Sequence, residues 1–356
     1  MSNHKTEYTH RVMSETPTKF WINNPTLQEA KQAIAAGAVC ATTNPTYLQR
    51  LLKEEHEYVQ SLVEKSLEKT NDNNVVADKV IQNAISRIQK LFYLIYKSTK
   101  GREGYVAIQG DPRVNNDSDA IIESALQYRQ IGENIIIKVP ATPAGAYALK
   151  QLIKSGIPVI ATLGFSVAQA VFMAEAYREA LKQTKTSPVC YITFIAGILD
   201  TYLSEKAERE GIIIGKELIQ QAGCSATRVA YKIFKERKYK AVLLGGGARG
   251  AHHFTELVGG DIAITIGWNL AHQLIEDNSI VVSRIDAKIS KHVLSELEEK
   301  LPDFRKAYYE KALLPEEFRE FGPVVSFQNS FLAGYSQLLD FITLCRASVQ
   351  NNKGGI

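Results

Sequence analysis

Short apolar runs alternate with helical patterns along most of this chain, and the alternation constrains the fold more than any other feature. The runs that read as strands are 19–23, 37–42, 104–109, 133–142, 157–162, 188–194, 239–244 and 261–266. Strands that alternate with helices form βαβ units, whose strands lie parallel in one sheet. Eight such units over about 260 residues favour a closed (β/α)8 TIM barrel over an open doubly wound sheet. The fold class is therefore predicted to be α/β.

The remaining residues are expected to lie outside the barrel. Residues 1–18 are polar and are predicted to form a flexible N-terminal arm, which leaves 19–284 for the barrel. Residues 285–356 are charged and helical, and we predict that they form a C-terminal helical extension packed on the barrel. The sequence does not say whether these helices cover the barrel or build a subunit interface, so a homo-oligomer stays open.

Composition argues against several classes of partner. The 356 residues include 42 basic and 38 acidic side chains, a net charge of +4 that is too mild to indicate nucleic acid or an anionic membrane. Neither a long apolar span nor a basic-then-apolar leader is visible. The four cysteines are scattered without a CxxC pair, which predicts a reduced, cytoplasmic protein.

The histidines do not indicate a metal site. Seven are present, including the adjacent pair His252 and His253, but no HExxH or similar ligand spacing occurs. Adjacent side chains on a helix are expected to diverge, so the pair is not predicted to chelate. We predict neither a metal nor a cofactor.

The run at 133–142 holds one lysine among apolar residues. Four apolar side chains surround Lys138, and Pro140 ends the run, as expected for a strand buried on both faces. An amine that loses hydration there favours its neutral form, which can attack a carbonyl and form a Schiff base. The alternative is a lysine whose stem lies on the strand while its ammonium reaches water, and for this run alone that is the commoner case.

Polar residues gather where the predicted strands end. In barrels of this kind the chemistry lies at the C-terminal ends of the strands. Around Lys138 those ends carry Asn23, Thr43, Asn44, Gln109, Thr162, Thr193 and the 245–249 segment that includes Arg249. The set predicts an active site at this mouth of the barrel. Each member also has an ordinary structural explanation, such as a turn, a β-forming threonine or a flexible glycine-rich loop.

An ordered set of motifs resembles the transaldolase family, including its fructose-6-phosphate aldolase branch. The motifs are ATTNPTYL at 41–48, QGDPR at 109–113, IIIKVPAT at 135–142 and GIPVIATLGFSVAQA at 156–170, with weaker matches at 191–200 and 243–250. The resemblance spans roughly 19–275. It implies an α/β barrel, metal-independent class I chemistry and a Schiff-base lysine at Lys138, and it outweighs the alternative reading of that residue.

The resemblance also implies roles for other positions. A dihydroxyacetone unit would pass from a ketose to an acceptor aldehyde, so the ligands would be sugars or sugar phosphates. Asn44 matches the residue that hydrogen-bonds substrate hydroxyls, and Thr162 matches the threonine that helps to hold the catalytic water. Arg249 matches a phosphate-binding arginine, whose planar fork grips two oxygens. The other positions expected at the substrate are Thr43, Thr193 and Ser166.

Three positions depart from the family pattern. The family's first strand ends in an aspartate that relays the C4 hydroxyl proton, and Asn23 stands there, although an amide cannot accept that proton. Gln109 replaces the glutamate of most transaldolases, as in the aldolase branch, and Ile198 replaces a second phosphate arginine. Fewer carboxylates should lower the pKa of Lys138. Three functions stay open: a transaldolase with an unusual substrate or proton shuttle, an aldolase without transfer, and a sugar-binding barrel that has lost turnover.

Overall fold

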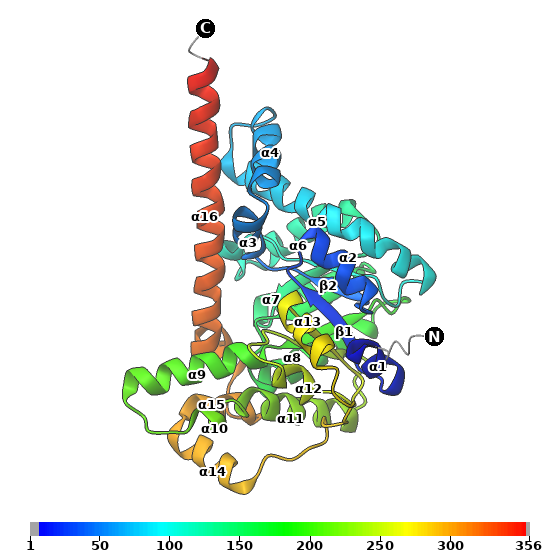
Figure 1. The fold of residues 1–356 in the computed structure, drawn as a ribbon, viewed down its shortest axis with the longest axis vertical. Helices are drawn as coiled ribbons and strands as arrows, with labels where there is room; N and C mark the ends of the chain where they lie inside the picture. Colours follow the sequence, from blue (N-terminus) through cyan, green and yellow to red (C-terminus); the bar gives the residue numbers. More distant parts are fainter. Residues whose placement is uncertain (1–6, 354–356) are drawn as a thin grey trace.

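The computed structural model describes residues 7–353, in which eight parallel strands close into a barrel (Figure 1). The strands are β1 (Lys19–Asn23), β2 (Cys40–Thr42), β3 (Val106–Ile108), β4 (Ile135–Pro140), β5 (Val159–Thr162), β6 (Cys190–Phe194), β7 (Val242–Gly245) and β8 (Ile262–Ile266). Each strand pairs in parallel with the next, and β8 closes the barrel by pairing with β1. The predicted (β/α)8 barrel is confirmed.

Helices surround the strands and extend the barrel at both ends of the chain. The first half contains α1 (Tyr8–Glu15), α2 (Leu27–Ala35), α3 (Tyr47–Glu54), α4 (His56–Leu67), α5 (Asn73–Ser98), η1 (Pro112–Val114), α6 (Ser118–Tyr128), η2 (Arg129–Ile131), α7 (Pro143–Lys154) and α8 (Val167–Leu181). The second half contains α9 (Ala196–Glu210), α10 (Lys216–Ile219), α11 (Ala222–Glu236), α12 (His252–Thr255), α13 (Trp268–Asp277), α14 (Lys291–Lys300), α15 (Pro302–Tyr308), η3 (Pro315–Glu320) and α16 (Gly322–Lys353). None of the helices in the described residues combines the length and apolar character that crossing a membrane requires.

The barrel interior consists of two layers set two residues apart on the strands. Residues two apart on a strand point to the same face, so each strand contributes one side chain to each layer. The lower layer consists of Trp21, Cys40, Ala107, Ile136, Ile160, Tyr191, Leu244 and Ala263, and Tyr105, two residues before Ala107, belongs to the same buried apolar cluster. The upper layer, two positions nearer the C-terminal ends, is polar or glycine: Asn23, Thr42, Gln109, Lys138, Thr162, Thr193, Gly246 and Thr265. The sequence thus places a buried apolar layer directly below a polar layer at the C-terminal end of the barrel.

The N-terminal segment is not the flexible arm that the sequence predicts. Helix α1 occupies residues 8–15 and buries Tyr8, Thr9 and Val12 against the body of the protein. The Thr9 hydroxyl donates to the Ala36 carbonyl over 2.7 Å, and the Tyr8 ring meets Phe254 edge to face with centroids 6.2 Å apart. The prediction is wrong because one face of this short polar segment carries enough buried surface to hold it. Residues 1–6 lie outside the described residues.

The terminal helix α16 runs along one side of the molecule, beside α3 and α4 (Figure 1). Near its start, the Gln328 amide donates to the Pro112 carbonyl over 2.6 Å. Farther along, Arg346 donates to Asn73 over 2.7 Å. Between these anchors Gly334 lies so close to the residues after β2 that a Cβ would come within 3.3 Å of the Pro45 carbonyl oxygen. The helix therefore closes one side of the barrel mouth, while the boundary at 284 stays a prediction.

Candidate active site

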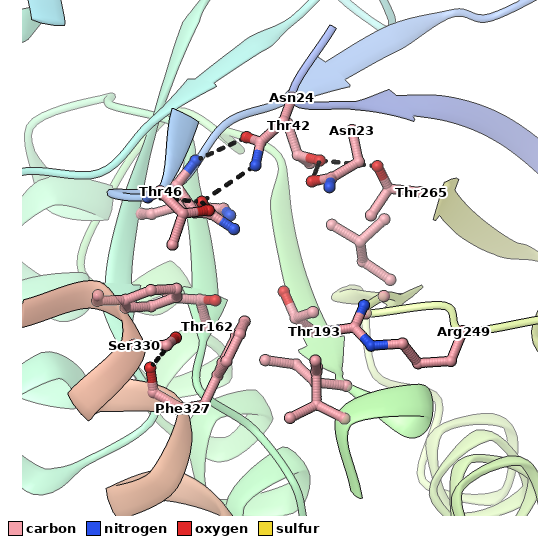
Figure 2. Close-up of a pocket in the computed structure, with 18 of the residues that line it drawn as sticks. Asn23, Asn24, Thr42, Thr46, Thr162, Thr193, Arg249, Thr265, Phe327 and Ser330 are labelled. Carbon is pink, nitrogen blue, oxygen red and sulfur yellow. Dashed lines mark hydrogen bonds between the residues drawn. The ribbon is translucent and has the colours of Figure 1, made fainter. Parts of the chain in front are cut away.

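A cavity of about 350 Å³ opens above the upper layer at the C-terminal ends of the strands (Figure 2). Its polar lining side chains are Asn23, Asn24, Thr42, Asn44, Thr46, Gln49, Lys138, Thr162, Thr193, Arg249, Thr265 and Ser330. Its apolar lining side chains are Ile195, Ile198, Leu244, Phe327 and Phe331. No aspartate or glutamate of the described chain lines it. The two charged lining residues, Lys138 and Arg249, are both basic, so the cavity suits a polar or anionic ligand.

Lys138 is enclosed by protein but opens to this cavity. Strand β4 carries it between neighbours that are buried in the barrel wall. Loss of hydration, with no opposing carboxylate, lowers the pKa of its amine to about 7. Among the described residues the amine has no hydrogen-bond or ion-pair partner. A large fraction of Lys138 is therefore an uncharged amine with a free lone pair near neutral pH.

Asn44 is fixed so that it presents donors to the cavity. Its side-chain oxygen accepts from the Thr46 amide over 3.0 Å, from the Thr46 hydroxyl over 2.7 Å and from the Asn24 side chain over 3.1 Å. A backbone N–H can only donate, so the atom facing Thr46 must be the oxygen. Asn24 completes the pair by accepting from the Asn44 backbone N–H over 3.1 Å. The Asn44 amide nitrogen is left for a ligand.

Asn23 ends a chain of hydroxyl groups on neighbouring strands. The Thr42 hydroxyl donates to the Asn23 side-chain oxygen over 2.9 Å, and it lies 2.7 Å from the Thr265 hydroxyl. Because the Thr42 hydroxyl has one proton and donates it to Asn23, the Thr265 hydroxyl must be the donor in its hydrogen bond with Thr42. Figure 2 shows this row along one wall of the cavity. The Asn23 oxygen is thus occupied, and its NH2 group remains to donate, so this wall supplies no base.

Buried polar groups without partners include the Gln109 side chain, directly after β3, and the Thr193 hydroxyl on β6. Both polar atoms of the Gln109 side chain and the hydroxyl of Thr193 lack a hydrogen-bond partner in the described chain. Thr162 lines the same cavity from β5 and is 2% exposed. A buried polar group left unpaired costs about 1–3 kcal/mol, so such groups gather where a ligand or water completes them. Gln109 does not itself line the cavity, although its strand position places it in the layer of Lys138.

Arg249 reaches into the cavity from the segment that follows β7. Figure 2 shows it opposite Thr46 and Phe327, with its guanidinium toward the centre. The guanidinium donates only to the Ala248 carbonyl, over 3.3 Å, and forms no ion pair in the described part of the chain. Its fork is therefore free to bind an anion. Ile198, at the position where the family resemblance implies a second arginine, lines the same cavity.

Two residues expected at the substrate do not line the cavity. Thr43 points the other way from Thr42, and its hydroxyl donates to the Ala107 carbonyl over 2.7 Å. Ser166 caps helix α8, where its hydroxyl accepts from the Gln169 amide over 3.1 Å. The structure therefore corrects both positions: strand alternation turns Thr43 outward, and helix capping occupies Ser166.

The lining includes residues that the sequence reading missed. Thr42 and Thr265 face inward two residues after Cys40 and Ala263, so the strand period alone could have found them. Asn24 follows β1 in a left-handed conformation with φ of 47°, which turns its amide toward Asn44. The contributions of α16 are Phe327, Ser330 and Phe331. These depend on how the last helix packs, and no local pattern announces them.

A second, smaller cavity lies beside Lys138. It measures about 20 Å³, room for one water, and Asp111 and Tyr128 also line it. The Asp111 carboxylate is already held by Arg113, whose Nε lies 2.9 and 3.0 Å from its two oxygens. This carboxylate therefore faces Lys138 only through a water-sized space.

The histidine pair also differs from expectation. The rings of His252 and His253 do not diverge, since their centroids are 3.9 Å apart. His252, His253 and Asp200 bring potential ligand atoms within 4.8 Å of one another, outside the cavity. Burial and the neighbouring His253 lower the pKa of His252 to about 4, so this ring is neutral near pH 7. The cluster borders Arg249 and is considered further below.

The fold and the site define an α/β barrel with a candidate active site built around one unpaired amine at the C-terminal mouth. The family model described as transaldolase/fructose-6-phosphate aldolase matches residues 20–321. The chain belongs to this family. Lys138, Asn44, Thr162, Thr193 and Arg249 lie together at that mouth, as the sequence predicts.

Individual relatives carry the same name at modest identity. A transaldolase of Prochlorococcus marinus (strain MIT 9312) is 29% identical over 293 residues, covering 79% of this chain and 81% of the relative. A transaldolase of Mycolicibacterium smegmatis is 30% identical over 209 residues, covering 56% of this chain and 55% of the relative. A transaldolase of Mycobacterium ulcerans is 29% identical over 211 residues, again with 55% of the relative covered. The chain thus matches about half the length of these mycobacterial relatives.

Proposed function

We propose that this protein is a transaldolase-like class I enzyme, which transfers a dihydroxyacetone unit between sugar or sugar phosphate substrates through a Schiff base on Lys138. The observation that carries the proposal is the pKa of Lys138, about 7, in a polar cavity that holds no carboxylate. An amine that is neutral near pH 7 is a competent nucleophile toward a carbonyl. The reaction needs no metal.

The proposed steps balance without any other reactant. The Lys138 amine adds to the ketose C2 carbonyl, and loss of water gives a protonated imine. The imine draws electrons from the C3–C4 bond, which breaks as the C4 hydroxyl gives up its proton to a water in the cavity and an aldehyde departs. The remaining enamine adds to an acceptor aldehyde, whose carbonyl oxygen takes up a proton when the new bond forms. Water then releases the product and restores the amine. Thr162, at the cavity wall, is assigned to hold that water.

The lining supports a hydroxylated, anionic ligand. The free amide nitrogens of Asn44 and Asn23 can donate to sugar hydroxyls, and the unpaired hydroxyl of Thr193 can complete this set. Arg249 is the residue assigned to the anion. With Ile198 in place of a second arginine, a single fork would hold that anion, which favours a differently placed phosphate, a carboxylate or a sulfonate.

Two other functions compete with transfer. Cleavage to a free ketone without transfer, as in a fructose-6-phosphate aldolase, is favoured by Gln109 at the position where most transaldolases have glutamate. A sugar-binding barrel without turnover is favoured by the absence of any carboxylate among the described lining residues. Release of dihydroxyacetone without an added aldehyde would indicate cleavage. Binding without exchange of the ketose carbonyl oxygen would indicate the binding protein.

Borohydride trapping tests the Schiff base directly. Incubation with dihydroxyacetone and borohydride should add a stable adduct at Lys138, identified by peptide mass spectrometry, and Lys138→Met should remove it. Only the neutral amine reacts, so with a pKa of about 7 the rate at pH 5 should be about 100-fold below that at pH 9. No adduct from dihydroxyacetone or a panel of ketose phosphates would refute the proposal.

We further propose a place in carbohydrate metabolism. Exchange of three-carbon units between sugar phosphates is chemistry of the pentose phosphate pathway, in the cytoplasm. All four cysteines are buried and free, which suits a reducing compartment. Fractionation of cells with an antibody to the protein would test the compartment.

A further inference from the structure

The segment that carries Arg249 is pressed onto the start of helix α9. A Cβ added to Gly197, near the start of that helix, would come within 2.3 Å of the Gly247 carbonyl oxygen and 2.9 Å of the Arg249 backbone nitrogen. Gly247 itself has φ of 66°, a left-handed conformation that glycine adopts without strain. The backbone of Arg249 is therefore set by its contact with α9 as well as by β7.

A buried carboxylate on α9 connects this helix to two others, α11 and α12. Asp200 is 6% exposed and lies about one helical turn beyond Gly197. One of its oxygens accepts from the Gly223 amide at the start of α11 over 2.6 Å. The other lies 3.0 Å from Nε2 of His253, which is 3% exposed. A carboxylate buried this deeply needs such partners, and both are present.

His253 links that carboxylate to Arg249. The Arg249 backbone N–H donates to Nδ1 of His253 over 3.4 Å. An N–H can only donate, so Nδ1 carries no proton, and in the neutral ring the proton is on Nε2. Nε2–H therefore donates to Asp200. One tautomer satisfies both contacts, and the Asp200 carboxylate selects it.

We propose that Asp200 and His253 are positioning residues for Arg249, which fix the backbone from which its guanidinium enters the cavity. This inference rests on the proposed function, because it concerns the anion that Arg249 would hold. The Asp200 carboxylate orients the His253 imidazole, and the imidazole accepts a hydrogen bond from the Arg249 backbone N–H. The close contact with Gly197 keeps the Arg249 backbone from moving toward α9. A site with one arginine gains most from holding that arginine in place.

The same residues also resemble a metal site, since Asp200, His252 and His253 have ligand atoms within 4.8 Å of one another. A metal on Nε2 of His253 would require the ring proton to sit on Nδ1. That proton would then oppose the Arg249 N–H, and two donors would face each other. The hydrogen-bond chain satisfies both contacts of His253, so it is preferred. Nε2 of His252 is buried without a partner in the described chain, and metal binding becomes an outcome of the test.

Asp200→Asn is the sharpest variant because it keeps the shape and reverses the hydrogen bonding. The Gly223 N–H would keep the amide oxygen, so the new NH2 group would face Nε2 of His253. That nitrogen would have to accept, the ring proton would move to Nδ1, and the contact with Arg249 would become repulsive. His253→Phe is the second variant, since its ring approximates the shape of the imidazole but offers Arg249 no acceptor.

Both variants are expected to bind inorganic phosphate with lower affinity than the wild-type protein. Titration calorimetry at pH 8 should show affinity reduced about three- to tenfold in each variant, the size of one lost hydrogen bond. In an Arg249→Ala background neither change should weaken binding further, because both act through Arg249. Asp303→Asn is the matched control: this carboxylate is held by Tyr202 and Lys206, away from the cavity, and phosphate affinity should not change.

Each contrary outcome has a distinct meaning. Unchanged phosphate affinity in both folded variants, or a further loss in the Arg249→Ala background, overturns the positioning role. Stoichiometric zinc in the purified protein that disappears in Asp200→Asn overturns it in favour of a metal site. Wild-type protein that traps dihydroxyacetone at Lys138 but binds no phosphate also overturns it. Failure of wild-type trapping is a failure of the proposed function instead, and the two results are read separately.

Discussion

At the N-terminal end of the barrel, Trp21, Tyr105 and Tyr191 fill the interior, whereas two residues farther along the strands Asn23 and Thr193 border an open cavity. The lower layer is apolar, and the rings of Trp21 and Tyr191 meet with their centroids 4.6 Å apart. The upper layer leaves polar groups unpaired. The same strands thus carry two environments that are separated by one repeat of the strand period.

The difference shows how a barrel divides stability from chemistry. The lower layer buries apolar surface and gains free energy from it. The upper layer retains an amine without a counterion and a hydroxyl without a partner, both of which cost stability. Active sites commonly carry such costs because a ligand completes the missing contacts. If this division is right, substitutions in the two layers should have opposite signs.

The largest effect should come from the lower layer. Trp21→Ala removes a side chain that is 1% exposed and leaves a cavity, so the free energy of unfolding should fall by about 3–5 kcal/mol in urea titrations. The comparison variant in the upper layer is Thr193→Val, which replaces an unpaired buried hydroxyl by a methyl group. It should change stability by less than about 1 kcal/mol, toward stabilisation. Similar losses at both positions would contradict the division.

The second effect depends on pH and concerns Lys138. Its pKa is lowered from 10.5 to about 7 by folding, so between these values the unfolded chain binds a proton that the folded protein does not. Wild-type stability should therefore rise with pH across this window. Lys138→Met carries no such charge, so its stability advantage should be about 2–3 kcal/mol larger at pH 6 than at pH 9.

The control for this measurement is Lys154→Met, which removes an exposed amine at the end of α7 and should show no comparable change between the two pH values. Chemical denaturation at pH 6 and pH 9 supplies both numbers. An advantage of Lys138→Met that is the same at both pH values would mean that the amine is not desolvated in the folded protein.

The smallest effect should come from Asn23→Asp. The new carboxylate would keep the hydrogen bond from Thr42 and add the base that this wall lacks. Transaldolase turnover of ketose phosphates should rise by about tenfold or more if Asn23 occupies the place of a lost proton relay. The anion should also raise the pKa of Lys138, which shifts the pH dependence of trapping upward. Unchanged or lower turnover would show that the assignment at β1 is wrong.

The sequence was sufficient for the barrel and for much of the candidate site. The alternation of strands and helices is a local signal, and the rule that strand ends meet at one mouth converts it into a shared location for Lys138, Asn44, Thr162 and Arg249. The lowered pKa of Lys138 follows from the apolar run around it and the missing carboxylates. Both expectations depend on neighbours in sequence or on a single topological rule.

The remainder depended on side-chain direction and on distant packing. The motif ATTNP does not show which of its two threonines faces the barrel interior, whereas in the structure the pleat turns Thr42 inward and Thr43 outward. The burial of α1 depends on contacts with Ala36 and Phe254, which no pattern within residues 1–18 contains. The wall formed by α16 likewise depends on contacts between residues far apart in the sequence, since Phe327, Ser330 and Phe331 line the same cavity as Thr42. No local pattern predicts such contacts.

The wall contributed by α16 has a consequence for how the protein is made. Phe327, Ser330 and Phe331 belong to the last helix, so every strand and Lys138 leave the ribosome before the segment that encloses the cavity. Until that helix docks, the cavity lacks the wall that these three side chains supply.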